Sequence, residues 1–197
     1  MKTVRRPCLK KFAAVLLIAL GLTTPSLANP DFALGPATGV TAPSIGTPKD
    51  QTGAPRSLQS LAGEKGLVLF FFRSAVWCPY CQAQLIDLNS GVAELTKRGY
   101  RLAGISYDKP DANAGFTAKW QIQYPLLSDT GSVLIDRFGL RDPQYKPGSI
   151  AFGVPRPIIF ILDGKGVIKA KLYEETYKTR PPVTLVIQTI DKLAAGG

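Results

Sequence analysis

The sequence predicts a three-layer α/β fold, in which helices cover both faces of a central mixed sheet. A continuous apolar run over residues 67–72 has the length of a strand that is buried on both faces. After this run, apolar segments of strand length alternate with segments of helical periodicity, which is the order of an α/β domain. The 197 residues are enough for one such domain and a preceding export signal.

The first 28 residues have the three parts of a secretory signal peptide. A basic segment precedes an apolar stretch over residues 12–22, and Ser26-Leu27-Ala28 fits a cleavage site. The apolar stretch is shorter than the roughly 20 residues of a membrane span. We therefore expect an exported protein, periplasmic or extracellular, without a stable membrane span. Residues 29–41 are expected to be a flexible leader, and residues 42–197 the folded domain.

Removal of the signal changes the charge and the cysteine count. The net charge falls from +10 to +5, because five basic residues and no acidic residue leave with it. The remaining charge has no dense basic run, so no nucleic-acid partner is expected. Cys8 also leaves, and the mature chain keeps only Cys78 and Cys81. The absence of histidine excludes Ser-His-Asp and Cys-His hydrolases and histidine metal sites.

The predicted elements follow one another from residue 67. The first strand leads into Trp77-Cys78-Pro79-Tyr80-Cys81, and a helix is expected from Pro79 to the C-cap at Gly99. Its buried stripe at helical spacing is Cys81, Leu85, Leu88, Val92 and Leu95. The later elements are a strand over 101–107, helix 111–122, short strand 124–127, short helix 132–138, loop 141–156, a hairpin of strands 158–162 and 167–173, and helix 183–193.

Cys78 and Cys81 carry the predicted chemistry. Cys78 lies where the buried strand gives way to a helix, and the unpaired N–H groups of a helix N-terminus favour a thiolate. Arg73 would add positive potential if its side chain turns toward the pair. The i, i+3 spacing puts both sulfurs on one helix face, where they can form a disulfide. We expect Cys78, after an exposed loop, to be the nucleophile, and Cys81, in the buried stripe, to be the resolving thiol.

Other roles of a C-x-x-C stay open on the residues alone. A zinc site would need two more ligands, and the chain has neither a second C-x-x-C nor a histidine. The pair could bind a soft metal such as Cu(I), or it could be an inert structural disulfide. The strand–motif–helix context favours redox catalysis over both. In that case the Cys78–Cys81 disulfide is the redox group, and we expect no other cofactor and no metal site.

These segments together resemble the thioredoxin superfamily, and within it the branch of alkyl hydroperoxide reductases and thiol-specific antioxidant proteins, the peroxiredoxin-like redoxins. The resemblance covers residues 42–195. It rests on Val68–Phe72, Trp77–Cys81, Gly104–Asp108, Tyr124–Asp129, Phe138–Gly139 and Pro157–Gly166. It implies a thioredoxin-like fold and an antioxidant oxidoreductase that reduces hydroperoxides at the expense of an unidentified thiol reductant. The C-x-x-C leaves two alternatives, a periplasmic thiol:disulfide oxidoreductase acting on protein cysteines and a non-enzymatic metal-binding module.

The resemblance also implies substrate-binding residues around the pair. It puts Pro157 in the place of the superfamily's cis-proline, opposite the cysteines, with Pro155 as the competing candidate. The backbone of Arg156 would then contact an extended substrate. Arg156 is also the nearest match, displaced by one residue, to the catalytic arginine of peroxiredoxins. Trp77 is either part of an apolar rim around Cys78 or a packing residue beneath the motif.

Three positions around the first cysteine depart from the patterns of related families. Peroxiredoxins typically have Thr or Ser three residues before the reactive cysteine and Pro seven before it. Ala75 and Phe71 stand at those positions here, and Ser74 lies one residue away. Plain thioredoxins carry a buried Asp six residues before the first cysteine, where this chain has Phe72. The sequence thus predicts thiol chemistry with an altered environment for its nucleophile.

Overall fold

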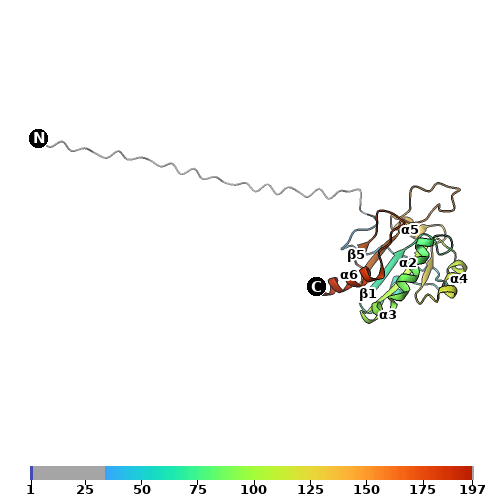
Figure 1. Cartoon of the computed structure of the whole chain (residues 1–197), viewed down its shortest axis with the longest axis horizontal. Coiled ribbons are helices and arrows are strands. Elements are labelled where there is room, and N and C mark those ends of the chain that lie inside the picture. Colours follow the sequence, from blue (N-terminus) through green and yellow to red (C-terminus); the bar gives the residue numbers. More distant parts are fainter. Residues whose placement is uncertain (2–33, 197) are drawn as a thin grey trace. The chain divides into compact units, whose positions relative to one another are not determined.

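The computed structural model describes residue 1 and residues 34–196 of the chain, and Figure 1 shows how its helices surround one sheet. The predicted signal peptide, apart from residue 1, lies outside the described residues. The elements are α1 (Leu58–Leu61), β1 (Gly66–Phe71), α2 (Pro79–Ser90), α3 (Val92–Lys97), β2 (Tyr100–Ser106), α4 (Pro110–Trp120), β3 (Leu126–Ser128), α5 (Val133–Arg137), β4 (Ile158–Asp163), β5 (Ile168–Leu172) and α6 (Val183–Ala195).

The five strands form one mixed sheet in the order β3-β2-β1-β4-β5. The strands β1, β2 and β3 run parallel to one another, and β4 runs antiparallel to both β1 and β5. The register pairs Phe71, the last residue of β1, with Ile105 of β2 and with Ile158 of β4. The segment that leaves β1 with the cysteine motif therefore starts beside the segment that enters β4. This topology confirms the predicted mixed sheet.

The sheet is covered on both faces, as the apolar run in β1 predicted. Val68 and Phe70 belong to one buried cluster, which includes side chains of α2, α3, α4 and α6. Leu67, Leu69 and Phe71 belong to a second cluster on the opposite face, together with side chains of α1 and α5. Because successive side chains of a strand point to opposite faces, a strand buried in this way needs apolar residues at every position. The predicted three-layer arrangement is confirmed.

The helix predicted from Pro79 to Gly99 is divided at Gly91 into α2 and α3. A Cβ atom at Gly91 would overlap the Val183 side chain of α6, so glycine allows α6 to pack closely at this point. The predicted stripe still faces the core, because the side chains of Cys81, Leu85, Leu88 and Leu95 are buried and Val92 packs against them. Gly91 could have indicated a break in the helix from the sequence alone. The contact with α6 could not be predicted, because α6 lies far away in the sequence.

Residues 34–41 correct the prediction of a flexible leader over residues 29–41. The Gly39 N–H donates to the Ile168 carbonyl at 2.8 Å, and the Ile168 N–H donates to the Val40 carbonyl at 2.9 Å. Thr41 forms an antiparallel bridge with Val167, and the Leu34 side chain is buried. The segment thus follows the exposed edge of β5 and pairs with it, which removes unpaired backbone groups from the sheet edge.

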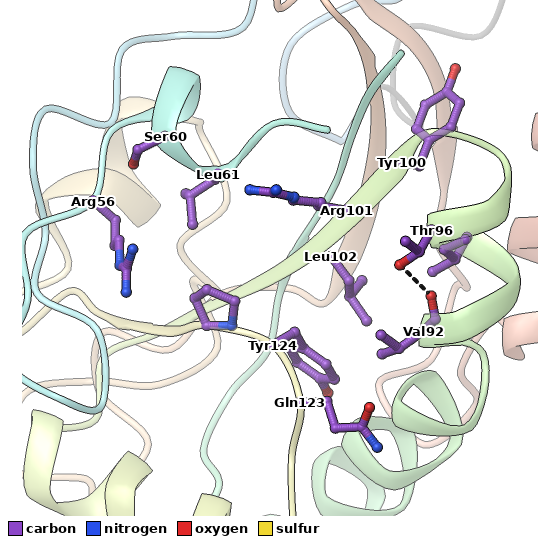
Figure 2. A pocket seen from close by; sticks show the side chains of 12 residues that line it. Arg56, Ser60, Leu61, Val92, Thr96, Tyr100, Arg101, Leu102, Gln123 and Tyr124 are labelled. Atoms are coloured by element: carbon purple, nitrogen blue, oxygen red, sulfur yellow. Dashed lines mark hydrogen bonds between the residues drawn. The ribbon is translucent and has the colours of Figure 1, made fainter. Parts of the chain in front are cut away.

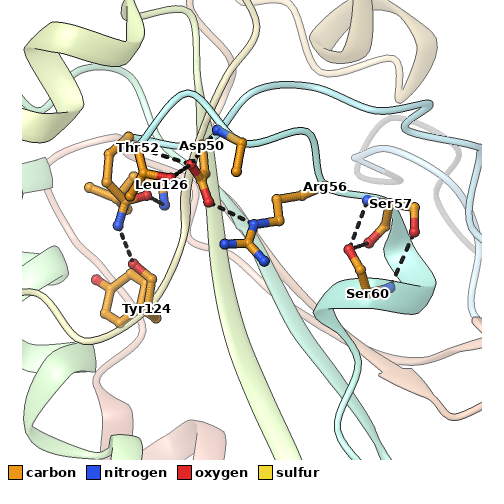
Figure 3. Close-up of polar contacts among 9 residues, drawn as sticks. Asp50, Thr52, Arg56, Ser57, Ser60, Tyr124 and Leu126 are labelled. Atoms are coloured by element: carbon orange, nitrogen blue, oxygen red, sulfur yellow. Dashed lines mark hydrogen bonds and ion pairs between the residues drawn. The ribbon is translucent and has the colours of Figure 1, made fainter.

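A buried carboxylate organises the segment between this edge and α1 (Figure 3). Asp50 is 1% exposed; its Oδ1 accepts the Thr52 N–H at 2.8 Å and its Oδ2 accepts the Arg56 Nε–H at 2.6 Å. Gln51 then joins the segment to the start of β3, because its amide accepts from Leu126 N and donates to the Tyr124 carbonyl. Helix α1, which follows, was not predicted.

None of the helices among residues 34–196 has both the length and the apolar character that crossing a membrane requires.

Candidate functional site

The cysteine pair lies at the N-terminus of α2, directly after β1. Cys78 is the N-cap residue, and its Sγ accepts the N–H of Cys81 at 3.2 Å. The two sulfurs form a disulfide with a Cα–Cα distance of 5.2 Å. Pro79 occupies the first helical position, where its missing N–H leaves no hydrogen bond unmade. The predicted disulfide and its position at a helix terminus are confirmed.

Both sulfurs are buried in the disulfide form, which differs from the accessible Cys78 that the sequence predicted. Cys78 is 2% exposed and Cys81 is fully buried, whereas Val76 in the preceding loop is 59% exposed. The reason is that an N-cap side chain turns back over the first turn of its helix. This turn brings the Cys78 sulfur into the buried cluster between α2 and the sheet.

Asp108, after the end of β2, holds the loop that carries the cysteines. Its carboxylate accepts the Ala75 N–H at 2.7 Å and the hydroxyl hydrogens of Ser74 at 2.9 Å and Ser106 at 3.1 Å. Burial raises the pKa of Asp108, against the opposing effect of these three hydrogen bonds. Ser74, next to the position where peroxiredoxins typically have Thr or Ser, is thus fully buried and bonded to Asp108.

Trp77 links the motif loop to the long loop over residues 141–156. Its indole N–H donates to the Tyr107 hydroxyl at 2.8 Å, and that hydroxyl donates to the Ile150 carbonyl at 2.7 Å. The Trp77 ring is half-buried and packs against the core cluster. The packing role that the sequence left open is therefore present, together with a bridging role that the sequence did not indicate. A substrate contact of Trp77 stays a prediction.

Arg73 is buried among aromatic rings beside the motif. Its guanidinium carbon lies 4.2 Å from the ring centroid of Tyr177 and 5.0 Å from those of Trp77 and Tyr145. Its Nη2 donates a hydrogen bond to the Tyr145 hydroxyl at 2.7 Å. Ring faces attract a cation at such distances. Arg73 therefore places a buried positive charge beside Trp77, the residue before Cys78, but within residues 34–196 no hydrogen bond joins it to either sulfur.

A second arginine, Arg180, contacts the pair directly and was not predicted. It lies in the loop before α6, and its Nη2 is 3.7 Å from the Cys81 sulfur. Burial, and then the nearby charge of Arg73, lower the pKa of Arg180 to about 10, whereas Tyr177 acts in the opposite direction. No sequence signal could have identified this residue, because 99 positions separate it from Cys81.

The prediction of a cis-proline is wrong for both candidates, Pro155 and Pro157. Within residues 34–196 the chain has no cis peptide bond. The segment is extended instead, because Pro155 forms a bridge with Arg141 and the Arg156 N–H donates to the Leu140 carbonyl at 2.7 Å. The Arg156 N–H is thus already paired and is not available to an extended substrate. This pairing corrects the expected substrate contact of the Arg156 N–H, whereas a contact through the Arg156 carbonyl stays a prediction.

The side chain of Arg156 lines a cavity that neither cysteine lines. Arg156 and Pro157 line a small cavity of about 100 Å³, and the side chains around them include Asp142, Glu174 and Tyr177. Within residues 34–196, no hydrogen bond joins Arg156 to Cys78 or Cys81. The arginine that contacts the pair is Arg180, within the β5–α6 connection.

Two further cavities lie at the opposite end of the sheet. One of about 220 Å³, shown in Figure 2, is lined by Tyr100 and Arg101 at the start of β2, by Pro125 just before β3, and by Arg56. Another, of about 480 Å³, lies beside the β4–β5 turn at Gly164. Because the cysteines follow the carboxyl end of β1, neither cavity belongs to the cysteine site. The described part of the chain holds no cluster of three or more metal-ligating carboxylate, cysteine or histidine side chains.

Comparisons with known proteins identify the family. The chain matches the AhpC/TSA family over residues 38–171. It is 32% identical over 128 residues to peroxiredoxin Bcp of Escherichia coli, and this match covers 65% of this chain and 80% of that protein. It is 26% identical over 152 residues to chloroplastic peroxiredoxin Q of Populus jackii, and this match covers 77% of this chain and 67% of that protein. The crystal structure of peroxidoxin BcpB from Mycobacterium tuberculosis superimposes with a TM-score of 0.66 and 26% identity, covering 80% and 96%. The chain therefore belongs to the AhpC/TSA family and is a thiol-dependent oxidoreductase of its peroxiredoxin branch.

Proposed function

We propose that this protein reduces hydroperoxides, with Cys78 as the nucleophile and Cys81 as the resolving cysteine. The observation that carries the proposal is the position of Cys78 at the N-cap of α2, where its sulfur accepts the Cys81 N–H. A hydrogen bond from a helix terminus stabilises a thiolate, which is the reactive form of the side chain. The membership in the AhpC/TSA family supports the choice of a peroxide as the substrate.

The reaction needs two thiols and one hydroperoxide. The Cys78 thiolate attacks the terminal peroxide oxygen, the O–O bond breaks, and the alcohol or water leaves with a proton. Cys78 is then a sulfenic acid, oxidised by two electrons. The Cys81 thiolate attacks the Cys78 sulfur, the S–O bond breaks, and hydroxide leaves and takes up a proton to become water. The resulting disulfide is the form seen here, and an external dithiol, or two thiols, returns the two electrons.

The aromatic and cationic surroundings fit a small polar substrate better than an extended peptide. Arg73 and Arg180 bring positive charge to the pair, and the rings of Trp77, Tyr145 and Tyr177 enclose Arg73. The developing negative charge on the leaving oxygen would be stabilised by such a field. We propose Trp77 as the apolar wall of the substrate site, and an unidentified thiol as the reductant.

A parallel assay separates peroxide reduction from protein-disulfide reduction. The protein, kept reduced with a dithiol, is supplied either with hydrogen peroxide or with insulin, and the loss of substrate is followed. Cys78→Ser serves as the control for uncatalysed reaction in both arms. We expect peroxide consumption well above this control and insulin reduction close to it. Preferential insulin reduction would instead assign the protein to dithiol–disulfide exchange.

We also propose export of the protein through the segment before Ala28. The basic, apolar and small-residue parts of residues 1–28 support this proposal. Mass spectrometry of the protein from its native host tests it, and we expect a mature chain that begins at Asn29. A mature chain that retains residues 1–28 would contradict it.

A further inference from the structure

The guanidinium of Arg180 is incompletely satisfied by the protein around it. Its Nη2 reaches the Cys81 sulfur at 3.7 Å, and its Nη1 donates to the Thr179 carbonyl at 2.9 Å. Its buried Nε has no hydrogen-bond partner within residues 34–196. A buried donor without a partner costs free energy, so such an arrangement persists when another state of the molecule supplies the missing interaction.

The charge of Arg180 is also uncompensated in the disulfide form. Within residues 34–196, no carboxylate lies within 4.0 Å of the guanidinium nitrogens of Arg180 or Arg73. Arg73 is itself 4% exposed and has a buried Nε without a partner. Two partly or fully buried cations thus lie close to a neutral disulfide. Reduction of that disulfide would create anionic sulfur at the place where Arg180 already points.

We propose that Arg180 stabilises the thiolate of Cys81, so that the resolving cysteine is kept ready for its attack on oxidised Cys78. This inference rests on the proposed function, in which Cys81 resolves a sulfenic acid. A fully buried cysteine among apolar side chains would otherwise stay protonated and react slowly. Cys81 lies in that situation, at the start of the buried stripe of α2. A charged N–H donor at its sulfur favours the anion.

The two cysteines are then activated by different parts of the fold. The N-terminus of α2 acts on Cys78, and the loop before α6 acts on Cys81. In the resolving step the Cys81 thiolate forms the S–S bond with Cys78, and the S–O bond of Cys78 breaks. The hydroxide that leaves takes up a proton from the solvent and becomes water. Arg180 holds the negative charge on sulfur before this step and loses its anionic partner after it. The rate of disulfide formation should therefore depend on Arg180.

The remaining charges near the pair do not provide an alternative to Arg180. They are Arg73 at the end of β1, Tyr177 and Lys178 in the loop before α6, Asp87 in α2 and Asp108 after β2. Asp87 accepts the N–H of Val183 at 2.7 Å, and Asp108 accepts from the motif loop. Lys178 is exposed, so water and salt screen its charge. In the described part of the chain, Arg180 is the charged side chain with a hydrogen bond to the Cys81 sulfur.

A titration of Cys81 as the only thiol tests the inference. The full chain with Cys8→Ser and Cys78→Ser serves as the parent, and the ultraviolet absorbance of the thiolate is followed against pH. Adding Arg180→Met should move the midpoint to higher pH by about 1–2 units, because a charge-assisted hydrogen bond is lost. Arg180→Lys should restore part of the shift. Lys178→Met, which removes an exposed charge two positions away, should leave the midpoint nearly unchanged.

Two outcomes would overturn the inference. One is an unchanged midpoint in Arg180→Met, and the other is an equal shift in Lys178→Met, which would indicate a general effect of charge. Circular dichroism checks that each variant is folded, and Arg180→Gln gives the same comparison if Arg180→Met is not. The titration involves no peroxide. A protein that shows the shift but consumes no peroxide would therefore contradict the proposed function and leave the role of Arg180 standing.

Discussion

The carboxylate of Asp108 accepts the backbone N–H of Ala75 at 2.7 Å. This bond joins the end of β2 to the loop that leads to Cys78, across 33 residues of sequence. Within the loop, the Ser74 hydroxyl accepts the Val76 N–H at 3.0 Å, but Ala75, at the position where peroxiredoxins typically have Thr or Ser, has no polar side chain. Asp108 therefore positions the segment before the nucleophile together with Ser74, whose hydroxyl hydrogen it also accepts.

Replacing Asp108 by Ala should destabilise the fold and disturb the site. The buried Ala75 N–H would lose its acceptor, which costs about 1–3 kcal/mol of unfolding free energy. Asp108→Asn keeps an oxygen for this N–H and should cost less. Urea unfolding measures both, and peroxide turnover should fall further in the Ala variant than in the Asn variant. Equal stability of the Ala variant and the wild type would contradict the role of this bond.

The titration of Asp108 should be visible in the pH dependence of stability. Burial raises its pKa above the ordinary 3.8, so between these two values the folded state binds the proton more tightly than the unfolded state. The wild type should therefore lose stability relative to Asp108→Asn as the pH rises from about 3.8 through the raised value. Urea unfolding of both proteins from acidic to neutral pH measures this. If the difference in unfolding free energy between the two proteins stayed constant with pH, the titration of Asp108 would not contribute to stability.

Tyr107→Phe should loosen the loop over residues 141–156. The change removes the hydroxyl that accepts from Trp77 and donates to the Ile150 carbonyl, while the ring keeps its packing. Global stability should fall by only about 1 kcal/mol for these bonds. Chymotrypsin cleavage after the exposed Phe152, inside the loop, should become faster. Tyr100→Phe, at the other end of the sheet, is the control, and similar cleavage rates in both variants would argue against the bridge.

Asp50 offers a test of stability that is remote from the cysteines. Burial alone would raise its pKa, but hydrogen bonds from Thr52 and Arg56 outweigh burial and lower the pKa below 3.8. Its stabilising effect is thus complete above the ordinary value and is lost as the pH falls through the lowered one. Asp50→Asn should cost about 1.5–3 kcal/mol at neutral pH, and this cost should shrink in acid. The Cys81 titration should stay unchanged in this variant.

The sequence was informative where the fold depends on neighbouring residues. The apolar run of β1 predicted a strand buried on both faces, and the order strand, C-x-x-C, helix placed Cys78 at a helix terminus. The Asp163-Gly164-Lys165-Gly166 turn predicted the hairpin of β4 and β5 in the same way. In each case the signal lies within one element or its caps, so no knowledge of the remaining chain was needed.

The errors concern contacts between distant segments. Gly91 divides the predicted long helix because α6 packs against it, and residues 34–41 pair with β5 although their composition indicated a loose segment. Arg156 and Pro157 were assigned by resemblance alone, and the pairing of Arg156 with Leu140 is visible only in the folded chain. Arg180 could not be identified from the sequence, because no motif around it indicates a contact with Cys81, 99 positions away.

Chemical trapping of the oxidised nucleophile tests the central claim most directly. Reduced Cys81→Ser and Cys78→Ser proteins are each treated with one equivalent of hydrogen peroxide in the presence of dimedone, and the adducts are located by mass spectrometry. The account predicts a sulfenic acid adduct on Cys78 in Cys81→Ser, because no resolving thiol remains, and little adduct on Cys81 in Cys78→Ser. An adduct on Cys81 in Cys78→Ser, with Cys78 unmodified in the other variant, would reverse the roles and contradict the account.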